Sequence, residues 1–416
     1  MGSRHSFDSN DAKSIVNRLQ ELFLANSGED PFEELYKLVV AKIFLETNGD
    51  MDSEYLAQGV NNREFVESVL RKANHKWPNI VQGTCEIKMT NEHLDVFLRE
   101  MQDISFSGSN FEIIDSFFES IVASTSKGAK GQYFTPRHVV ECLVRIINPR
   151  PGELICDPAC GSGGFLIHAV EHLKNKADIS DIKKCVYGFD FDKKAVSVCR
   201  ALMILAGCGT TNFHQINSLL KPSAGLIPTE EYYGYNIEDA LNSSTNGFSG
   251  FDVIITNPPF AGEIKEPHIL NSYSLASRKK RVERDALFLE RCVNLLKPGG
   301  RIAIVLPVNK FSTKTWGYLR EWLIRNVEVK AVLGLGRSAF MPYTSQKTNV
   351  LFAKKRLKPI KFSDALSEEV HFFLSEMSGK DNKGNFIIKA QDAETLWDRV
   401  DHDLADVVTM TEGLWR

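Results

Sequence analysis

A short apolar strand that runs into a glycine-rich turn and then a helix constrains the fold of this chain more than any other stretch. The strand is expected at Gly152-Glu-Leu-Ile-Cys156, the turn reads Asp157-Pro-Ala-Cys-Gly-Ser-Gly-Gly164, and helical spacing follows from Phe165 to about Lys174. Strand, glycine turn and helix form the first unit of doubly wound α/β folds that bind nucleotides. We therefore predict a doubly wound, Rossmann-like α/β sheet.

The turn differs from the dinucleotide fingerprint G-x-G-x-x-G, and this difference indicates which ligand it binds. Asp157 would repel a pyrophosphate, but it would accept hydrogen bonds from a cationic amino acid moiety. A second predicted strand, Cys185-Val-Tyr-Gly-Phe-Asp190, ends in an acid that suits the two hydroxyls of a ribose. The expected ligand is a nucleoside that carries an amino acid, which is S-adenosylmethionine. Asp157, Ala159 and Gly161 are candidate contacts in the turn.

A second apolar strand is predicted in Phe251-Asp-Val-Ile-Ile-Thr-Asn-Pro-Pro-Phe260, where it runs directly into Asn257-Pro-Pro-Phe260. Two consecutive prolines force the chain out of the sheet and hold Asn257 and the Pro258 carbonyl in one rigid array. Such a pair of acceptors beside an aromatic ring suits the exocyclic amino group of a planar base. The alternative is a strand that simply ends in a proline turn.

Length and charge predict several domains with different partners. The 416 residues are enough for two or three domains, and the net charge is −3. The count is 11 basic and 21 acidic residues up to Ser126, 33 and 20 in the middle, and 6 and 12 from Lys361 onward. The middle, at +13, is expected to bind a polyanion, whereas the acidic flanks are expected to meet protein.

The domain organisation follows from periodicity. Residues 1–126 are predicted to form a helical domain that clamps a partner or DNA, with apolar spacing such as Leu35, Leu38, Val39 and Ile43. Residues 127–360 are predicted to form the catalytic domain, and residues 361–416 a short tail for partner docking. The eight cysteines include no Cys-x-x-Cys pair, and no run reaches membrane-spanning length. We expect reduced thiols, no metal site and a cytoplasmic location.

A further motif, Gln132-Tyr-Phe-Thr-Pro-Arg137, follows a glycine-rich linker. Thr135 is predicted to cap a helix that has Pro136 at its first position and continues through Val139 and Leu143. By itself, the motif indicates no more than a capped helix with two packed aromatic residues.

Taken in order, Gly131-Gln-Tyr-Phe-Thr-Pro136, Asp157-Pro-Ala-Cys-Gly-Ser-Gly-Gly-Phe165 and Asn257-Pro-Pro-Phe260 resemble the motifs of one family. The chain is similar to the modification subunit of type I restriction-modification systems, an adenine-N6 DNA methyltransferase. The likeness covers about residues 126–355. It also includes Lys297-Pro-Gly-Gly-Arg-Ile-Ala-Ile-Val-Leu-Pro307 and Gly334-Leu-Gly-Arg-Ser-Ala-Phe340.

The resemblance implies roles for residues at the matching positions. The cofactor is expected to contact Gln132, Tyr133, Phe134, Thr135, Pro136, Arg137, Ser162, Gly163, Gly164 and Asp190. The target adenine, swung out of the duplex, is expected to contact Asn257, Pro258, Pro259 and Phe260. Many relatives carry an acid after the third strand to bind the cofactor's adenine amino group. This chain has Asn217 there, and its amide oxygen is expected to accept that bond instead.

Candidate DNA contacts lie in Ser277-Arg-Lys-Lys-Arg-Val-Glu-Arg284, whose positive charges could follow a phosphate backbone. The candidates are Arg278, Lys279, Lys280, Arg281 and Arg284, with Lys310 and Arg337 as weaker ones. A solvated run of charge is the alternative. His138, His168 and His172 fall at helical positions and are interpreted as structural.

Sequence recognition is not predicted within this chain. The only insertion in the catalytic domain, residues 219–250, is too short and too poor in basic residues to read several base pairs. We expect a separate specificity subunit, together with double-stranded DNA, a second copy of the chain or a restriction subunit as further partners. The alternatives are a methyltransferase of protein glutamine or an RNA base, and a non-catalytic scaffold subunit that senses the cofactor.

Overall fold

The computed structural model describes residues 31–48, 62–102, 105–106, 117–118, 135–222, 236–242, 248–393 and 395–415. The chain divides into two compact units. The first comprises residues 1–129 and 192–213, and the second comprises residues 130–191 and 214–416. The helical unit therefore includes a segment that lies within the predicted catalytic domain in sequence.

The first unit is built from helices α2 (Pro31–Asn48), α3 (Asn62–Lys76), α4 (Asn91–Gln102) and α9 (Lys193–Leu205). The periodic residues of α2, Leu35, Leu38, Val39 and Ile43, are at most 1% exposed, but the helix is not amphipathic, because its polar residues Glu34, Lys37 and Lys42 are buried as well. The Tyr36 hydroxyl in α2 donates to the Ser197 carbonyl in α9 over 2.9 Å. Residues 1–30, 107–116 and 119–126 of the predicted helical domain lie outside the described residues.

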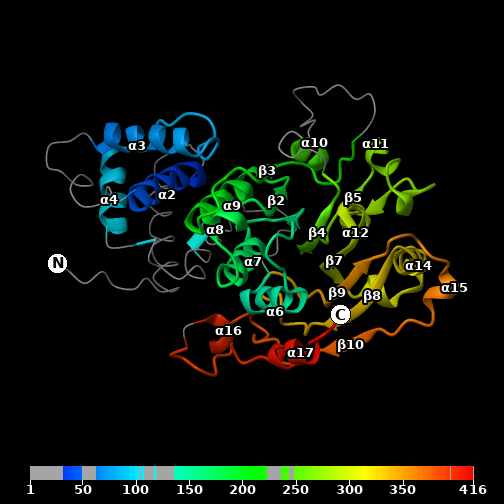
Figure 1. Cartoon of the computed structure of the whole chain (residues 1–416). Coiled ribbons are helices and arrows are strands. Elements are labelled where there is room, and N and C mark those ends of the chain that lie inside the picture. Colours follow the sequence, from blue (N-terminus) through cyan, green and yellow to red (C-terminus); the bar gives the residue numbers. More distant parts are fainter. Residues whose placement is uncertain are drawn as a thin grey trace. The chain divides into compact units, whose positions relative to one another are not determined.

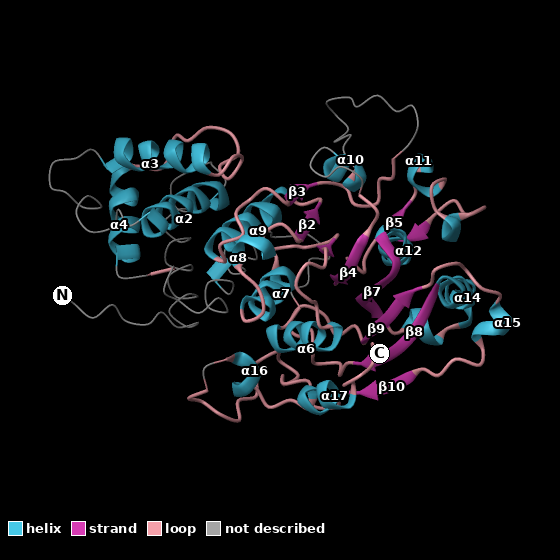
Figure 2. Ribbon diagram, in the orientation of Figure 1, coloured by secondary structure: helices cyan, strands magenta, loops and turns pink. Residues whose placement is uncertain are grey.

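An eight-stranded sheet forms the centre of the second unit, with the order β10-β8-β9-β7-β4-β1-β2-β3 (Figure 2). The strands are β1 (Ile155–Asp157), β2 (Val186–Asp190), β3 (Phe213–Gln215), β4 (Phe251–Thr256), β7 (Leu296–Pro307), β8 (Val327–Gly334), β9 (Thr348–Lys355) and β10 (His371–Leu374). Strands β4 and β2 both pair with β1 in parallel, and β7 continues parallel to β4. Strand β9 is antiparallel to its neighbours β7 and β8.

Helices cover the faces of this sheet, as apolar strands with no alternating polar face require. Helices α12 (Arg284–Leu295) and α14 (Gly317–Asn326) share one buried cluster with Ile254 and Ile302 of the sheet. Helices α6 (Arg137–Ile147) and α7 (Gly164–Lys174) contact β1, β2, β4 and β7. Side chains alternate along a strand, so Val253 and Ala303 point away from the first cluster, toward the second pair of helices.

Short elements complete the second unit. They are α8 (Ile179–Ile182), α10 (Ile237–Asn242), β5 (Glu263–Ile264), α11 (Pro267–Leu270), η1 (Ser274–Ala276), β6 (Val282–Glu283), α13 (Asn309–Ser312), η2 (Lys314–Trp316) and α15 (Phe362–Ala365). Strands β5 and β6 pair as a separate antiparallel ribbon. This ribbon closes an excursion of the chain between β4 and α12.

Residues 361–416 are integrated into the second unit. Strand β10 extends the sheet by pairing in parallel with β8. Helices α16 (Leu396–Arg399) and α17 (Leu404–Met410) lie beside α6 (Figure 1). The Trp415 indole N–H donates to the Ile146 carbonyl at the far end of α6, over 2.7 Å. The tail predicted from the sequence is thus part of the sheet domain's structure.

Candidate active site

The site predicted from the sequence lies where the order of the strands reverses. The chain moves outward from β1 to β2 and β3, and then returns to place β4 on the other side of β1. Ligands of open α/β sheets bind at the carboxyl ends of strands at such a switch point. Asp157 ends β1, and Asn257 directly follows β4. The structure therefore brings together two motifs that are 100 residues apart in sequence.

The glycine turn adopts backbone conformations that favour glycine. Gly161 and Gly163 have φ values of 53° and 95°. The Gly161 N–H donates to Asp190 Oδ2 over 2.9 Å, which ties the turn to the end of β2. A Cβ built on Gly164 would overlap the guanidinium of Arg137, which is 7% exposed. The turn, Asp190 and Arg137 thus form one connected site.

Asn257 is held by the threonine of the third motif. Its Nδ2 donates to Thr135 Oγ1 over 2.9 Å. Its Oδ1 is buried and accepts no hydrogen bond from the residues that the structure describes. A buried acceptor without a partner is a position for a donor from a ligand, because leaving it unpaired is unfavourable. Asn257 therefore presents a fixed acceptor at the edge of the sheet.

The prediction that Thr135 caps the helix is wrong. Helix α6 begins at Arg137 with Pro136 at the cap position, and no side chain caps it. The Thr135 hydroxyl is used by Asn257, a residue remote in sequence, and local patterns carry no information about such a pairing. The tyrosine, phenylalanine and glutamine at positions 132–134 lie outside the described residues.

Burial dominates the electrostatics of Asp157. The side chain is 1% exposed, and desolvation raises its pKa to about 7 despite a hydrogen bond of 3.0 Å from the Ala159 N–H to Oδ1. The Thr256 hydroxyl lies close enough to favour the carboxylate, but without hydrogen-bond geometry. Asp157 Oδ2 is thus a second buried acceptor at the switch point that pairs with none of the described groups.

Two aromatic residues flank the site. Phe260 is half-buried, and its ring packs edge-on against Phe340, with 6.4 Å between centroids. Phe191 directly follows Asp190 and is 66% exposed. Sequence reasoning missed Phe191, although an apolar ring next to an acid at a strand end was a usable signal. Such an exposed ring can stack on a planar heterocycle whose ribose meets Asp190.

Asn217 follows β3 and is part of a local turn. Its Oδ1 accepts from the Leu219 N–H over 3.2 Å, and its carbonyl accepts from the Leu220 N–H over 3.0 Å. An amide oxygen has two lone pairs, so a further bond to a ligand is compatible with this turn. The insertion that follows is only partly described, at residues 219–222, 236–242 and 248–250.

The basic segment lies on the excursion between β4 and α12. The Arg284 N–H donates to the Gly262 carbonyl over 3.0 Å, so the excursion closes two residues beyond Phe260. Arg278 and Lys280 are exposed, and neither is ion-paired to a described residue. Lys279 lies 3.0 Å from the Tyr318 ring centroid, and Arg281 pairs with Glu263 at 3.4 Å.

Lys310 is unsuitable as a DNA contact, contrary to the weaker prediction. It is 1% exposed and pairs with Glu283 at 2.5 Å and Asp285 at 3.0 Å. Two carboxylates and the Trp316 ring, 4.1 Å away, enclose its ammonium group. The sequence does not reveal this burial, because lysine is usually exposed. Arg337, the other weaker candidate, is exposed.

The histidines of α6 and α7 make structural contacts. His168 Nδ1 lies 2.8 Å from Glu141 Oε2, and His172 Nε2 lies 2.9 Å from Asn148 Oδ1. Within the described ranges, no group of three His, Cys, Asp or Glu residues gathers as a metal site. No helix among these residues is long and apolar enough to cross a membrane.

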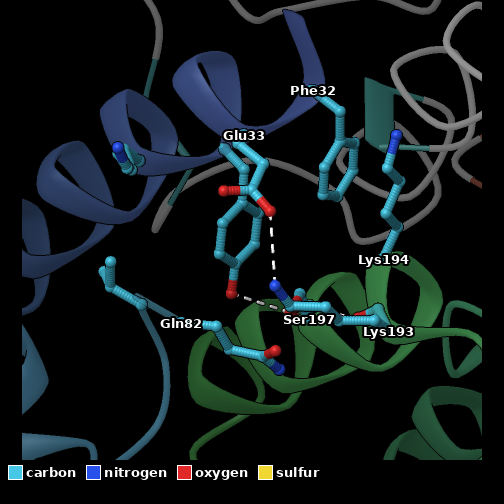
Figure 3. A pocket seen from close by; sticks show the side chains of 9 residues that line it. Phe32, Glu33, Gln82, Lys193, Lys194 and Ser197 are labelled. Carbon is cyan, nitrogen blue, oxygen red and sulfur yellow. Dashed lines mark hydrogen bonds and ion pairs between the residues drawn. The ribbon is translucent and has the colours of Figure 1, made fainter. Parts of the chain in front are cut away.

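A hollow of about 310 Å³, counting its open mouth, lies within the first unit (Figure 3). Several of its polar groups are paired with one another. Lys193 lies 3.3 Å from Glu33, Lys194 lies over the Phe32 ring at 5.2 Å, and the Tyr36 hydroxyl donates to the Ser197 carbonyl. Such internal pairing indicates a structural contact between α2 and α9.

Solved methyltransferases share the fold of this chain. A solved methyltransferase subunit of a type I restriction-modification system from Streptococcus thermophilus superposes with a TM-score of 0.61. The superposition covers 98% of this chain and 93% of that one, at 14% identity. A modification subunit from Vibrio vulnificus YJ016 gives a TM-score of 0.65 at 18% identity, with 98% and 90% coverage.

The chain belongs to the N-6 DNA Methylase family, whose profile matches residues 111–410. The type I restriction enzyme EcoEI methylase subunit of Escherichia coli is 29% identical over 266 residues, which cover 62% of this chain and 50% of that protein. The EcoKI methylase subunit of Escherichia coli strain K12 is 25% identical over 347 residues, covering 77% and 62%. The chain thus spans about half to three-fifths of the length of these relatives.

Proposed function

We propose that this chain is the modification subunit of a type I restriction-modification system and methylates adenine N6 in DNA. The observation that carries the proposal is Asn257, whose Nδ2 is fixed by Thr135 and whose buried Oδ1 has no partner among the described residues. This acceptor points to an amino group as its ligand. The family match and the named relatives support DNA as the acceptor.

The residues at the switch point fit S-adenosylmethionine as the cofactor. The buried Asp157 Oδ2 suits the ammonium group of its amino acid moiety, Asp190 suits its ribose, and the exposed Phe191 ring suits its adenine. When bound, this cofactor supplies an electrophilic methyl group on a sulfonium sulfur. Arg137, which lies against the glycine turn, is suited to the carboxylate of the same moiety.

The chain's own residues are proposed to position the base. An adenine stacked in a duplex must first be swung out, which costs a few kcal/mol. Asn257 Oδ1 and the Pro258 carbonyl then accept from the two N6 hydrogens, which aims the nitrogen lone pair out of the ring plane. Phe260, supported by Phe340, stacks on the base. Orientation of the nitrogen provides most of the rate enhancement.

DNA binding is assigned to the basic excursion, with recognition supplied by a separate specificity subunit. Arg278 and Lys280 are exposed on the segment that closes beside Phe260, so phosphate contacts there would place the duplex near the pocket. A second copy of this chain and a restriction subunit are further proposed partners.

The test is methyl transfer from labelled S-adenosylmethionine to unmethylated genomic DNA, by the chain alone and with its specificity subunit. We expect labelled N6-methyladenine only when the specificity subunit is present. Labelling by the chain alone would contradict the division of labour. Labelling of RNA or of protein glutamine in place of DNA would refute the proposed substrate.

A further inference from the structure

Ser378, in the carboxyl-terminal segment, contacts two different elements of the candidate active site. Its carbonyl lies 2.8 Å from His138 Nε2, and its hydroxyl lies 2.5 Å from Ser338 Oγ. His138 immediately follows the Thr135-Pro136-Arg137 stretch that holds Asn257. Ser338 stands two residues before Phe340, whose ring packs against Phe260. Ser378 therefore joins the two elements that support Asn257 and Phe260.

The contact with His138 is fully buried. His138 is 0% exposed, its ring stacks on His402 at 5.4 Å, and Phe386 packs edge-on against it at 5.9 Å. Burial lowers the pKa of His138 to about 3, so the ring is neutral at neutral pH. A carbonyl can only accept, which fixes Nε2–H as the donor to Ser378. Gly379 packs so closely that a Cβ there would overlap Val400 and crowd His138.

The loop that carries Phe340 is held by the same segment at further points. Lys380 Nζ donates to the Met341 carbonyl over 2.9 Å. The backbone of Gly384 lies against Pro342, so that a Cβ would overlap the proline. Phe340 itself is 1% exposed, and its position depends on these surroundings.

We propose that residues 375–386 position the two walls of the base pocket, acting through His138 and Ser378. His138 and Ser378 are positioning residues: neither touches the base, and each fixes an element that does. One branch runs from Ser378 through His138 to Thr135 and Asn257, and the other runs through Ser338 to Phe340 and Phe260. The inference rests on the proposed function, because the pocket is the one assigned to the target adenine.

The two branches are tested with separate variants of the full chain, bound to its specificity subunit. His138→Leu removes the donor to Ser378, whereas His138→Gln keeps an N–H of similar reach. Ser338→Ala and Ser378→Ala, singly and together, remove the hydroxyl contact. Thr395→Ala is the matched control, since it removes the cap of α16 farther along the carboxyl-terminal segment, where the Thr395 side chain accepts from the Asp398 N–H.

Three readouts separate positioning from general stability. They are the single-turnover rate of methyl transfer, the fluorescence of 2-aminopurine at the target adenine, and the Kd of S-adenosylmethionine from calorimetry. We expect His138→Leu to lower the rate about tenfold, with His138→Gln restoring most of it. Ser338→Ala should lower the 2-aminopurine signal and leave the cofactor Kd unchanged. The Ser338→Ala/Ser378→Ala double variant should lose no more than either single variant.

The outcomes are distinguishable. If the wild-type complex transfers no methyl group to adenine, the proposed function fails. If the wild type is active, and the folded His138→Leu and Ser338→Ala variants match it in rate and fluorescence, only the positioning inference fails. An equal loss in Thr395→Ala, or a failure of His138→Gln to restore the rate, would also overturn the inference, because both would indicate a general effect on stability.

Discussion

Replacing Thr135 by valine removes the only described hydrogen bond of the Asn257 amide while keeping the shape of the side chain. The bond joins Asn257 Nδ2 to Thr135 Oγ1 over 2.9 Å in a partly buried setting. Leaving such a donor unpaired costs about 1 to 3 kcal/mol. If this loss falls on the transition state, the methyl-transfer rate drops about 5- to 150-fold. The reason is that an amide free to rotate no longer holds its oxygen toward the base.

The assay is single-turnover transfer at saturating cofactor and DNA, with the cofactor Kd measured separately. Thr135→Ser is the matched control, because it retains the hydroxyl and should keep a rate within about threefold of wild type. The expected pattern is a loss in rate by Thr135→Val that exceeds any loss in cofactor affinity. A folded Thr135→Val variant with the wild-type rate would refute the assignment of Thr135 as the support of Asn257.

Three further predictions follow from the site. Burial raises the pKa of Asp157 to about 7, whereas the carboxyl of the unfolded chain has a pKa of about 4. The free energy of unfolding of the cofactor-free protein should therefore fall as the pH rises from about 4 to about 7. Because a cationic ligand needs the carboxylate, cofactor affinity should weaken about tenfold per pH unit below pH 7. Calorimetry should show this pH dependence, and Asp157→Asn should abolish it. Arg278→Ala and Lys280→Ala should each reduce the slope of log affinity for DNA against log salt concentration by about one. Lys358→Ala, which changes an exposed lysine elsewhere, is the control that should leave this slope unchanged. Gly164→Ala should displace the guanidinium of Arg137 and weaken cofactor binding; an unchanged Kd would contradict the contact.

The sequence was sufficient to predict the part of the fold that local patterns determine. Apolar runs that end at Asp190 and Thr256 became β2 and β4, and the helix after the glycine turn begins at Gly164. Parallel strands align their carboxyl ends, so these strand assignments alone place the glycine turn and Asn257 at one edge of the sheet. This is why the main features of the site were predictable.

What the sequence could not reveal depends on contacts between distant residues. Thr135 and Asn257 meet across 122 positions, and Ser378 and His138 across 240. Composition placed Lys310 among exposed cations, but the partners Glu283 and Asp285 allow it to be buried. The incorporation of β10 into the sheet was likewise hidden, because a short apolar stretch near the end of a chain has no distinctive period.

The most direct test of the account is the identity of the methylated nucleoside made by the wild type and by Asn257→Ala. The complex with its specificity subunit would be incubated with duplex DNA and labelled S-adenosylmethionine, and the digested DNA analysed by mass spectrometry. The account predicts N6-methyladenine from the wild type and none from Asn257→Ala, with the cofactor Kd of the variant nearly unchanged. Continued transfer by Asn257→Ala, or a methyl group on a different base, would contradict it.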